Sequence, residues 1–364
     1  MNLPEDVLVE ILSRCPVKSL VRFRAVCKSW HILVNNQSFV STHLNQQLAA
    51  SSGGRLLVSH RDNLTNKRLI SFSADDNLDN FANQLDLPPF LNQNFSHVRL
   101  IGPCNGLVCL YGFPDNIALW NPATRDCKVL PMSWVPRPAM ARVLGGDLAF
   151  GFDSKTGDYK VVQILFCSSN QLGVAYQVEI YTLRTDSWRK YEGTLPAHIM
   201  YLNVWSMIYR PETFCWWAKD SENTEIVLSF DMGDETFQKA ALPSDAGDLG
   251  GELKNIRAIM PMNGALALVV YRLKEVEKVF DLWVLREVGV EAAWTRLSSI
   301  GPLLGVERPL GFWKNGEFIL ENSCGQLVLY EPRFQKIRNL GLQGKRDRLE
   351  VLVYRDSLVS LTNI

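Results

Sequence analysis

Residues 117–131 read IALWNPATRDCKVLP, two apolar runs that flank a polar turn. The first run ends on Trp120, the middle six residues are mostly of types that favour turns, and the second run stops at a Leu-Pro pair. Short apolar runs bounded in this way are typical of β-strands. The stretch therefore predicts a β-hairpin, and it decides most of the fold because the same hairpin returns along the chain.

Six strand-like runs end on an aromatic residue and then enter a turn. The aromatic residues are Phe72, Trp120, Tyr181, Phe230, Trp283 and Tyr330. They follow one another at intervals of 48, 61, 49, 53 and 47 residues, with two further strand-like runs ahead of each repeated hairpin. A four-stranded unit that recurs about every fifty residues is typical of a β-propeller blade. We predict six blades, or seven if the longest interval holds a degenerate blade; a β-sandwich is the alternative that the regular spacing disfavours.

The ends of the repeat region indicate how the ring closes. The first hairpin, within residues 55–73, has no strands ahead of it, whereas LEVLVYR (349–355) and SLVSL (357–361) follow the last hairpin without a hairpin of their own. C-terminal strands that complete the N-terminal blade would satisfy both ends and leave no open sheet edge. We therefore expect a ring closed by these two C-terminal strands.

The start of the chain has helical spacing instead. Behind Pro4, which the first turn of a helix tolerates, Leu8, Ile11, Leu12 and Cys15 lie at i, i+3, i+4 and i+7. This pattern predicts an amphipathic helix that ends near the next proline.

A second helix is expected over residues 17–28, with Ser29 and Ser38 as N-caps of a third helix and of another short piece. The fold class is therefore α+β multidomain, a small helical module followed by an all-β domain. The expected divisions are a helical module over 1–45, a linker over 46–54 and a β-propeller over 55–364.

The segment LVRFRAVCKSW, residues 20–30, is basic and apolar at once. On a helical wheel its apolar side chains fall within an arc of about 120°, and the cations lie outside that arc. Residues 1–45 carry a charge of only +2, which is weak for a nucleic-acid module. A core of this size cannot absorb all of its apolar side chains, so we expect the remainder to contact the β domain or another protein.

The composition narrows the classes of partner and compartment. Lys plus Arg and Asp plus Glu each number 38, so no overall charge draws the chain to nucleic acid or to a membrane surface. The eight cysteines form no CxxC pair, and no run of apolar residues is long enough for membrane insertion. The N-terminus carries acids where a secretory signal would be positive. We expect reduced thiols and a location in the cytoplasm and/or nucleus.

Residues 2–44 resemble the F-box, in the form found in plants. LPEDVLVEIL, PVKSLVRFRAVCKSW and SFV match its motif in order and with the expected gaps. The resemblance implies that this module docks a Skp-type adaptor, which joins it to the cullin and RING subunits of an SCF-type ubiquitin ligase. The adaptor-facing residues carried over from the motif are Leu3, Pro4, Leu8, Ile11, Leu12, Val17, Leu20, Cys27 and Trp30. Cys15 departs from the motif, which usually has leucine there.

GLVCLYG, IALWNPATR and LAFGFDSKTGDYKVV are similar to the F-box-associated domain of plant F-box proteins, often called kelch-like. That group includes S-locus F-box proteins and regulators of immune-receptor turnover. The domain lacks the paired glycines and the spaced Tyr and Trp of true kelch repeats, since Gly145-Gly146 lies out of register. The resemblance implies a non-catalytic receptor subunit whose β domain captures a protein substrate, as yet unidentified, for ubiquitination and degradation. A scaffold outside any ligase is the alternative, and a propeller hydrolase is a third class.

The sequence contains no recognisable catalytic or metal-binding motif. It has no HExxH, no paired zinc-ligand spacing, no P-loop and no GxSxG elbow. Paired acids such as Asp234 and Glu235 fall in expected turns, where acids are ordinarily solvated. We therefore expect no catalytic residue, no metal and no cofactor.

Two connections between repeats are longer than turns require and are rich in the residue types found at interface hot spots. The candidate substrate-binding residues are Trp134, Arg137 and Arg142 in the first connection and His198, Tyr201 and Trp205 in the second. The alternative for Trp134 and Trp205 is that they wedge between blades.

Overall fold

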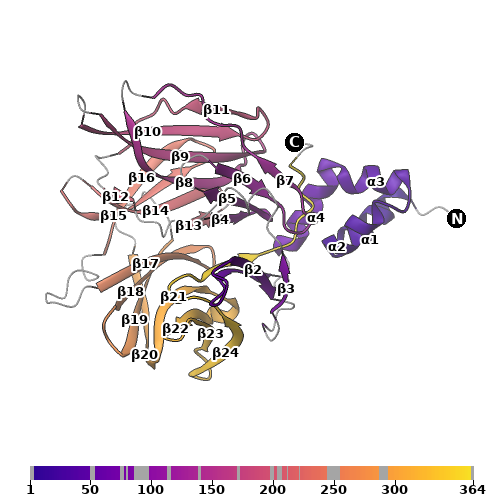
Figure 1. Cartoon of the computed structure of the whole chain (residues 1–364). Helices are drawn as coiled ribbons and strands as arrows, with labels where there is room; N and C mark the ends of the chain where they lie inside the picture. Colours follow the sequence, from indigo (N-terminus) through magenta and orange to yellow (C-terminus); the bar gives the residue numbers. More distant parts are fainter. Residues whose placement is uncertain are drawn as a thin grey trace.

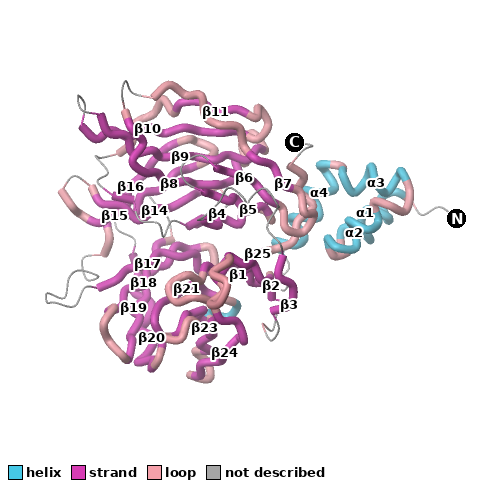
Figure 2. Tube along the Cα trace, viewed as in Figure 1, coloured by secondary structure: helices cyan, strands magenta, loops and turns pink. Residues whose placement is uncertain are grey.

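The computed structural model shows a small helical module attached to a ring of β-sheets (Figure 1). The four α-helices lie in the N-terminal module, and the rest consists of strands and loops with a short 3-10 helix at Lys314–Gly316 (Figure 2). The structure describes residues 4–49, 54–73, 78, 81–85, 98–112, 116–137, 141–169, 173–196, 201–202, 207–210, 212–220, 222–243, 255–286 and 294–361.

Four helices form the N-terminal module. They are α1 (Glu5–Ser13), α2 (Val17–Phe23), α3 (Lys28–Asn35) and α4 (Gln37–Ala49). Pro4 and Pro16 precede α1 and α2, where their missing N–H groups cost nothing. Of the four, α4 lies nearest to the β-sheets (Figure 1).

The predicted helix over 17–28 is wrong, because α2 ends at Phe23 and the chain turns before α3 begins. The turn brings the rings of Phe23 and Trp30 together edge-to-face, with centroids 5.3 Å apart. Cys27, rather than Ser29, occupies the N-cap position of α3. The single helical wheel drawn over residues 20–30 therefore does not apply.

Ser38 is likewise not a helix cap. The Oδ1 atom of Asn36 accepts hydrogen bonds from the backbone N–H groups of Ser38 (2.8 Å) and Phe39 (3.4 Å), so Asn36 caps α4.

The first three sheets each contain four antiparallel strands. Sheet one holds β1 (Arg55–Arg61), β2 (Arg68–Ser73), β3 (Phe81–Leu85) and β25 (Glu350–Tyr354). Sheet two holds β4 (Val98–Cys104), β5 (Leu107–Gly112), β6 (Asn116–Trp120) and β7 (Cys127–Val129). Sheet three holds β8 (Arg142–Asp153), β9 (Asp158–Ser169), β10 (Gly173–Thr182) and β11 (Ser187–Lys190).

The other three sheets complete the ring, so the prediction of six blades is confirmed. Sheet four holds β12 (Tyr201–Leu202), β13 (Met207–Arg210), β14 (Thr213–Lys219), β15 (Glu225–Asp231) and β16 (Thr236–Ala241). Sheet five holds β17 (Asn255–Met262), β18 (Ala265–Arg272), β19 (Glu277–Leu285) and β20 (Trp294–Leu304). Sheet six holds β21 (Val306–Phe312), β22 (Phe318–Asn322), β23 (Gln326–Glu331) and β24 (Lys336–Gln343). The longest interval in the repeat is taken up by the 12-residue strands β8 and β9.

The hairpin of the opening stretch recurs with one geometry. In four blades the aromatic residue at the last or second-last position of the third strand pairs with the residue seven positions later, as Trp120 does with Cys127. The residue five positions after each aromatic adopts a left-handed φ of 49–66° and closes the turn. These turn residues are Arg125, Asp186, Glu235 and Gln335.

The ring closes through one C-terminal strand, not two. β25 pairs antiparallel with β1, with Leu352 opposite Leu57. Because β3 already supplies the outer strand, the first blade lacks only one strand. Residues 357–361, predicted as a second closing strand, are therefore not a strand.

The innermost strands lie in contact around the centre of the ring; they are β25, β4, β8, β13, β17 and β21. Helix α4 shares a cleft with Asn105, Phe152 and Glu212, which lie at or just after the C-terminal ends of inner strands. The N-terminal ends of inner strands instead line a separate cavity of ≈ 350 Å³, which includes Val98 and Glu350. The helices therefore lie at one mouth of the ring, and this cavity lies at the other.

Candidate protein-binding sites

The apolar side chains of the helical module divide between a core and an exposed surface. Leu12, Val17 and Leu20 are buried together with Val34 and Phe39. Ile11 is 49% exposed, although it follows the same helical spacing as Leu12. A neighbouring surface residue, Val7, lies one turn earlier on the same face of α1 and is also exposed.

The residues carried over from the motif thus occupy three environments. Leu12, Val17 and Leu20 are buried in the core of the module, Leu8 and Trp30 are partly buried against it, and Pro4, Ile11 and Cys27 are exposed. Leu3 lies outside the described residues.

Besides Leu48, which lines the cleft between α4 and the propeller, three further apolar side chains are exposed on this module and were missed as candidates. Val7 could have been found from its i, i+4 spacing to Ile11. Val26 and Ile32 could not be placed from the sequence, because their exposure depends on the turn between α2 and α3. We call Val7, Ile11, Val26 and Ile32 the exposed apolar set.

Cys27 also has a polar environment. Its Sγ atom lies 3.1 Å from the hydroxyl oxygen of Ser29, and hydrogen bonding by Ser29 and by the backbone of Trp30 lowers the pKa of the thiol. By contrast, burial raises the pKa of the thiols of Cys109 and Cys215 inside the propeller. All eight cysteines are free.

On the propeller, the connection between β7 and β8 carries the first set of predicted substrate-binding residues. Trp134 is 88% exposed, which rules out its predicted alternative role as a wedge between blades. Arg142, at the start of β8, is also exposed. Both therefore lie free at the surface of the connection that leads into the inner strand of the third blade.

Arg137 has a different environment, because its guanidinium donates to the carboxylate of Glu179, whose side chain is fully buried. Gln177 donates a second hydrogen bond to the same carboxylate, at 2.7 Å. The indole N–H of Trp188 donates to the carbonyl of Pro131 at 2.7 Å. These contacts hold the connection against the third blade and leave Trp134 projecting from it.

The second set of predicted substrate-binding residues lies largely outside the residues that the structure describes. Tyr201 begins β12, but its side chain is not described, and His198 and Trp205 lie outside the described residues.

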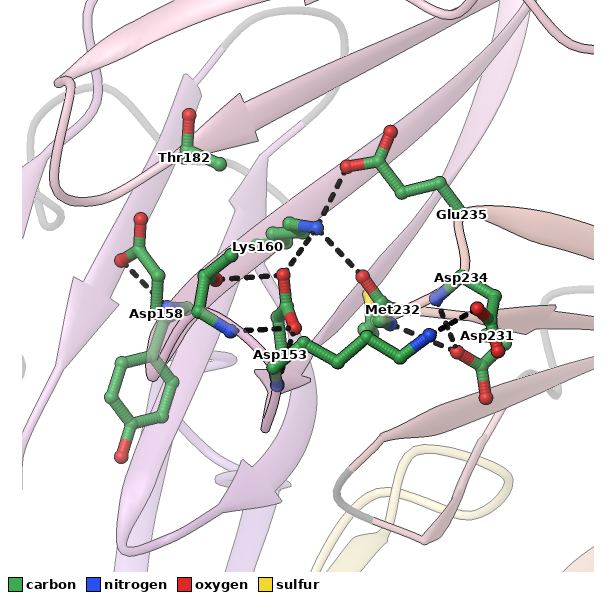
Figure 3. A network of polar contacts seen from close by, with 12 residues as sticks. Asp153, Asp158, Lys160, Thr182, Asp231, Met232, Asp234 and Glu235 are labelled. Atoms are coloured by element: carbon green, nitrogen blue, oxygen red, sulfur yellow. Dashed lines mark hydrogen bonds and ion pairs between the residues drawn. The ribbon is translucent and has the colours of Figure 1, made fainter.

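A polar network joins the third and fourth blades (Figure 3). The Nζ atom of Lys160 lies 2.7 Å from Oδ2 of Asp153, from Oε1 of Glu235 and from the carbonyl oxygen of Met232. Arg189 donates to Glu235 as well. The three donors of the Lys160 ammonium are thus all used, so this buried cation cross-links two blades.

The acids of this network are held ionised. Burial raises the pKa of Asp153, but hydrogen bonds from Lys160 and Thr156 outweigh it, so the pKa lies below its usual value. The pKa of Glu235 is lowered in the same way, with burial outweighed by Arg189 and Lys160. The predicted solvated turn acids are therefore in part structural ion-pair partners. Within the described ranges, no group of three or more His, Cys, Asp or Glu side chains is arranged to hold a metal ion.

Comparison with protein families matches both parts of the chain. Residues 55–362 match the F-box associated beta propeller domain, and residues 1–42 match the F-box domain. The chain belongs to the F-box associated beta propeller family.

Similar proteins of this family architecture occur in Arabidopsis thaliana. The F-box/kelch-repeat protein At3g23880 is 28% identical, covering 99% of this chain and 96% of its own length. F-box protein CPR1 is 25% identical, covering 94% and 85%. Among solved structures, TolB from Acinetobacter baumannii has a TM-score of 0.43 and 14% identity, covering 86% of this chain and 70% of its own.

An F-box followed by a propeller, together with F-box protein relatives, supports a substrate-recognition role in SCF complexes in general. The F-box domain implies binding of a Skp-type adaptor. In the part of the chain that the structure describes, no helix has the length and apolar character needed to cross a membrane.

Proposed function

We propose that this chain is the substrate-recognition subunit of an SCF-type ubiquitin ligase, without catalytic residues of its own. Its F-box docks a Skp-type adaptor, which brings the cullin and RING subunits, and its propeller holds a protein for ubiquitination and degradation in the cytoplasm or nucleus. The observation that carries the proposal is a helical module with an exposed apolar set, mounted at one mouth of a closed propeller.

The exposed apolar set supports direct contact with the adaptor. Burying an apolar side chain that is half exposed contributes about 1 kcal/mol, so a few such side chains provide the centre of an interface. Ile11 and Val7 would contact the adaptor, and Leu8 and Trp30 would complete the surface from partly buried positions. The roles of Leu12, Val17 and Leu20 would be indirect, because they shape the core beneath this surface.

The β7–β8 connection supports a role in substrate binding. Trp134 and Arg142 are exposed and belong to the residue types that dominate interface energies. Arg142 begins inner strand β8 at the end far from α4, so substrate would be held away from the adaptor-binding helices. Arg137 would contribute by holding the connection in place.

The test is co-purification of the full chain with a plant Skp-type adaptor and a cullin. We expect both to be retained by the parent chain and lost with Ile11→Asp. Leu64→Asp is the matched control, since Leu64 is an exposed leucine in the propeller turn between β1 and β2. Adaptor binding without cullin would favour the scaffold function, and no binding to any such adaptor would falsify the proposal.

A further inference from the structure

Residues 355–361 follow the closing strand β25 and connect the propeller to the helical module. After Tyr354 the chain leaves the first blade without forming another strand and passes beside α4 (the yellow segment in Figure 1). We call residues 355–361 the C-terminal strap. It contacts three separate parts of the protein, each through a different kind of interaction.

The second blade holds the strap by hydrogen bonds. Asn121, the first residue of the turn in the opening stretch, is fully buried, and its Nδ2 group donates to the carbonyls of Ser357 (3.0 Å) and Val359 (2.8 Å). Its Oδ1 atom accepts from the backbone N–H of Ala123 (3.0 Å), which orients the amide. One side chain of the second blade, Asn121, therefore forms hydrogen bonds with the carbonyl groups of two strap residues, Ser357 and Val359.

The turn between β4 and β5 is shaped around the same segment. Gly106 has a φ of +78°, and a Cβ atom there would lie 2.2 Å from Cβ of Ser357 and 2.9 Å from the carbonyl oxygen of Arg355. No other residue type fits without displacing the strap, since both the conformation and the space exclude a side chain.

Consecutive residues of the strap pack into two different cores. Leu358 is 1% exposed and joins the core of the helical module with Leu12, Val17 and Leu20. Val359 and Leu361 instead join the core shared by the second, third and fourth blades. An extended chain directs successive side chains to opposite sides, which allows one short segment to join both cores.

The helices also contact the propeller directly, since Val40 of α4 packs against the propeller core and Ala123 of the second blade packs against the core of the helical module. An open space lies beside these contacts. A cleft of ≈ 430 Å³ separates α4 from the blade turns, with Leu48 and Asn45 on one wall and Phe152 and Tyr159 on the other. Leu358, Val359 and Ser360 of the strap line this cleft. Arg355 adds a hydrogen bond to the carbonyl of Gln47 in α4.

We propose that the C-terminal strap fixes the orientation of the F-box helices on the propeller, with Leu358 and Asn121 as positioning residues. Resting on the proposed ligase function, this orientation sets where the held protein lies relative to the adaptor, and hence which of its lysines are reached. The positioning acts through the fold, since neither residue needs to touch adaptor or substrate.

Distance measurement in the full chain tests the orientation directly. Cys27 on the helical module and Cys324 on the sixth blade are exposed, so spin labels on these two native thiols report the distance between the two parts. The parent chain is expected to give one narrow distance distribution. Leu358→Ala and Asn121→Ala are expected to broaden it, whereas Leu64→Ala is the matched control and should leave it unchanged.

A truncated chain is a second kind of variant, to be used in case a point substitution prevents folding. Truncation after Asp356 keeps β25 and ring closure but removes Leu358 and Val359. Retained adaptor binding with a broadened distribution supports the strap. Unchanged distributions in folded Leu358→Ala, Asn121→Ala and truncated chains would overturn it.

The ligase readout separates the two proposals. In Asn121→Ala, which leaves the core of the helical module intact, adaptor affinity should stay unchanged while the pattern of ubiquitinated lysines on a captured protein changes, which a loss of general stability would not produce. If the parent chain fails to bind any adaptor, the proposed function fails, yet the distance measurement still decides the role of the strap.

Discussion

Lys160 of β9 and Glu235 of the β15–β16 turn form an ion pair across the boundary between the third and fourth blades, with Nζ 2.7 Å from Oε1. The same ammonium group pairs with Asp153, and the Lys160 side chain is almost completely buried. Ion pairs also join other neighbouring blades, as between Arg99 and Asp147 and between Arg257 and Glu225. The charges of Lys160, Asp153 and Glu235 stabilise the fold only while all three groups are ionised.

Replacing Lys160 by methionine leaves the Asp153 carboxylate buried without its cation. We expect a loss of about 3–5 kcal/mol in the free energy of unfolding, measured by urea denaturation. Lys155→Met is the matched control, because the Lys155–Asp234 pair is exposed to solvent and should contribute nothing measurable. An equal loss in both variants would show that burial is not the cause.

The same network predicts acid sensitivity. The pKa values of Asp153 and Glu235 are lower in the folded chain than their ordinary values of 3.8 and 4.5. A carboxyl with a lowered folded pKa contributes stability above its unfolded pKa and loses that contribution as the pH falls through the folded value. The melting temperature should therefore drop steeply below about pH 4.5, and less steeply in Lys160→Met. If the melting temperatures of the parent chain and of Lys160→Met fell equally steeply with pH, the acid sensitivity would not come from this network.

Arg137 and Arg142 are predicted to differ although both belong to the same connection. Arg137→Ala removes the cation beside buried Glu179 and should cost about 3 kcal/mol of stability. Arg142→Ala changes an exposed side chain and should alter stability by less than about 0.5 kcal/mol. Chemical denaturation of the two variants tests this, and only Arg142→Ala is then suitable for testing substrate contact.

Leu20→Asp and Ile11→Asp should both impair adaptor binding, for different reasons. Leu20 is fully buried, so an aspartate there places a charge in the core and unfolds the helical module. Ile11→Asp should keep the helical signal in circular dichroism and weaken adaptor binding by at least about tenfold, equivalent to 1.4 kcal/mol. Loss of helix in Ile11→Asp would place Ile11 in the core instead.

Gly106→Ala tests how closely the second blade fits the strap. The positive φ and the overlap with Ser357 predict a loss of about 1–3 kcal/mol in thermal or urea unfolding. Gly264→Ala is the control, since Gly264 has a similar φ of +76° but no atom within 4 Å of the added Cβ. A larger loss in Gly106→Ala than in Gly264→Ala would isolate the contact with the strap.

The propeller could be predicted from the sequence because its repeat is local. Each hairpin is specified within about fifteen residues by an aromatic residue, a turn and a second strand. The left-handed turn position at Arg125 and its equivalents shows the shared geometry behind that pattern. The sequence predicted that C-terminal strands close the ring, and one such strand, β25, does so. The second predicted closing strand does not form, because β3 already supplies the outer strand of the first blade.

The exposed apolar set was harder to predict. Helical spacing identified Leu8, Ile11 and Leu12 as apolar, yet spacing does not say which of two neighbouring residues faces the core. The break after Phe23 leaves Cys27 at the surface and brings Phe23 against Trp30, a contact between two helices that helical spacing does not specify. Lys160 gave no sequence signal, because two of its three partners, Glu235 and Met232, lie in another blade.

By itself the sequence determined the family, the helical module and the number of blades, since these follow from motifs and repeats that are short and local. Only the tertiary structure decided that Ile11 is exposed while Leu20 is buried, that Lys160 links two blades, and that Leu358 and Val359 enter different cores. The physical reason is that burial and pairing depend on segments far apart in the chain, which no local pattern specifies.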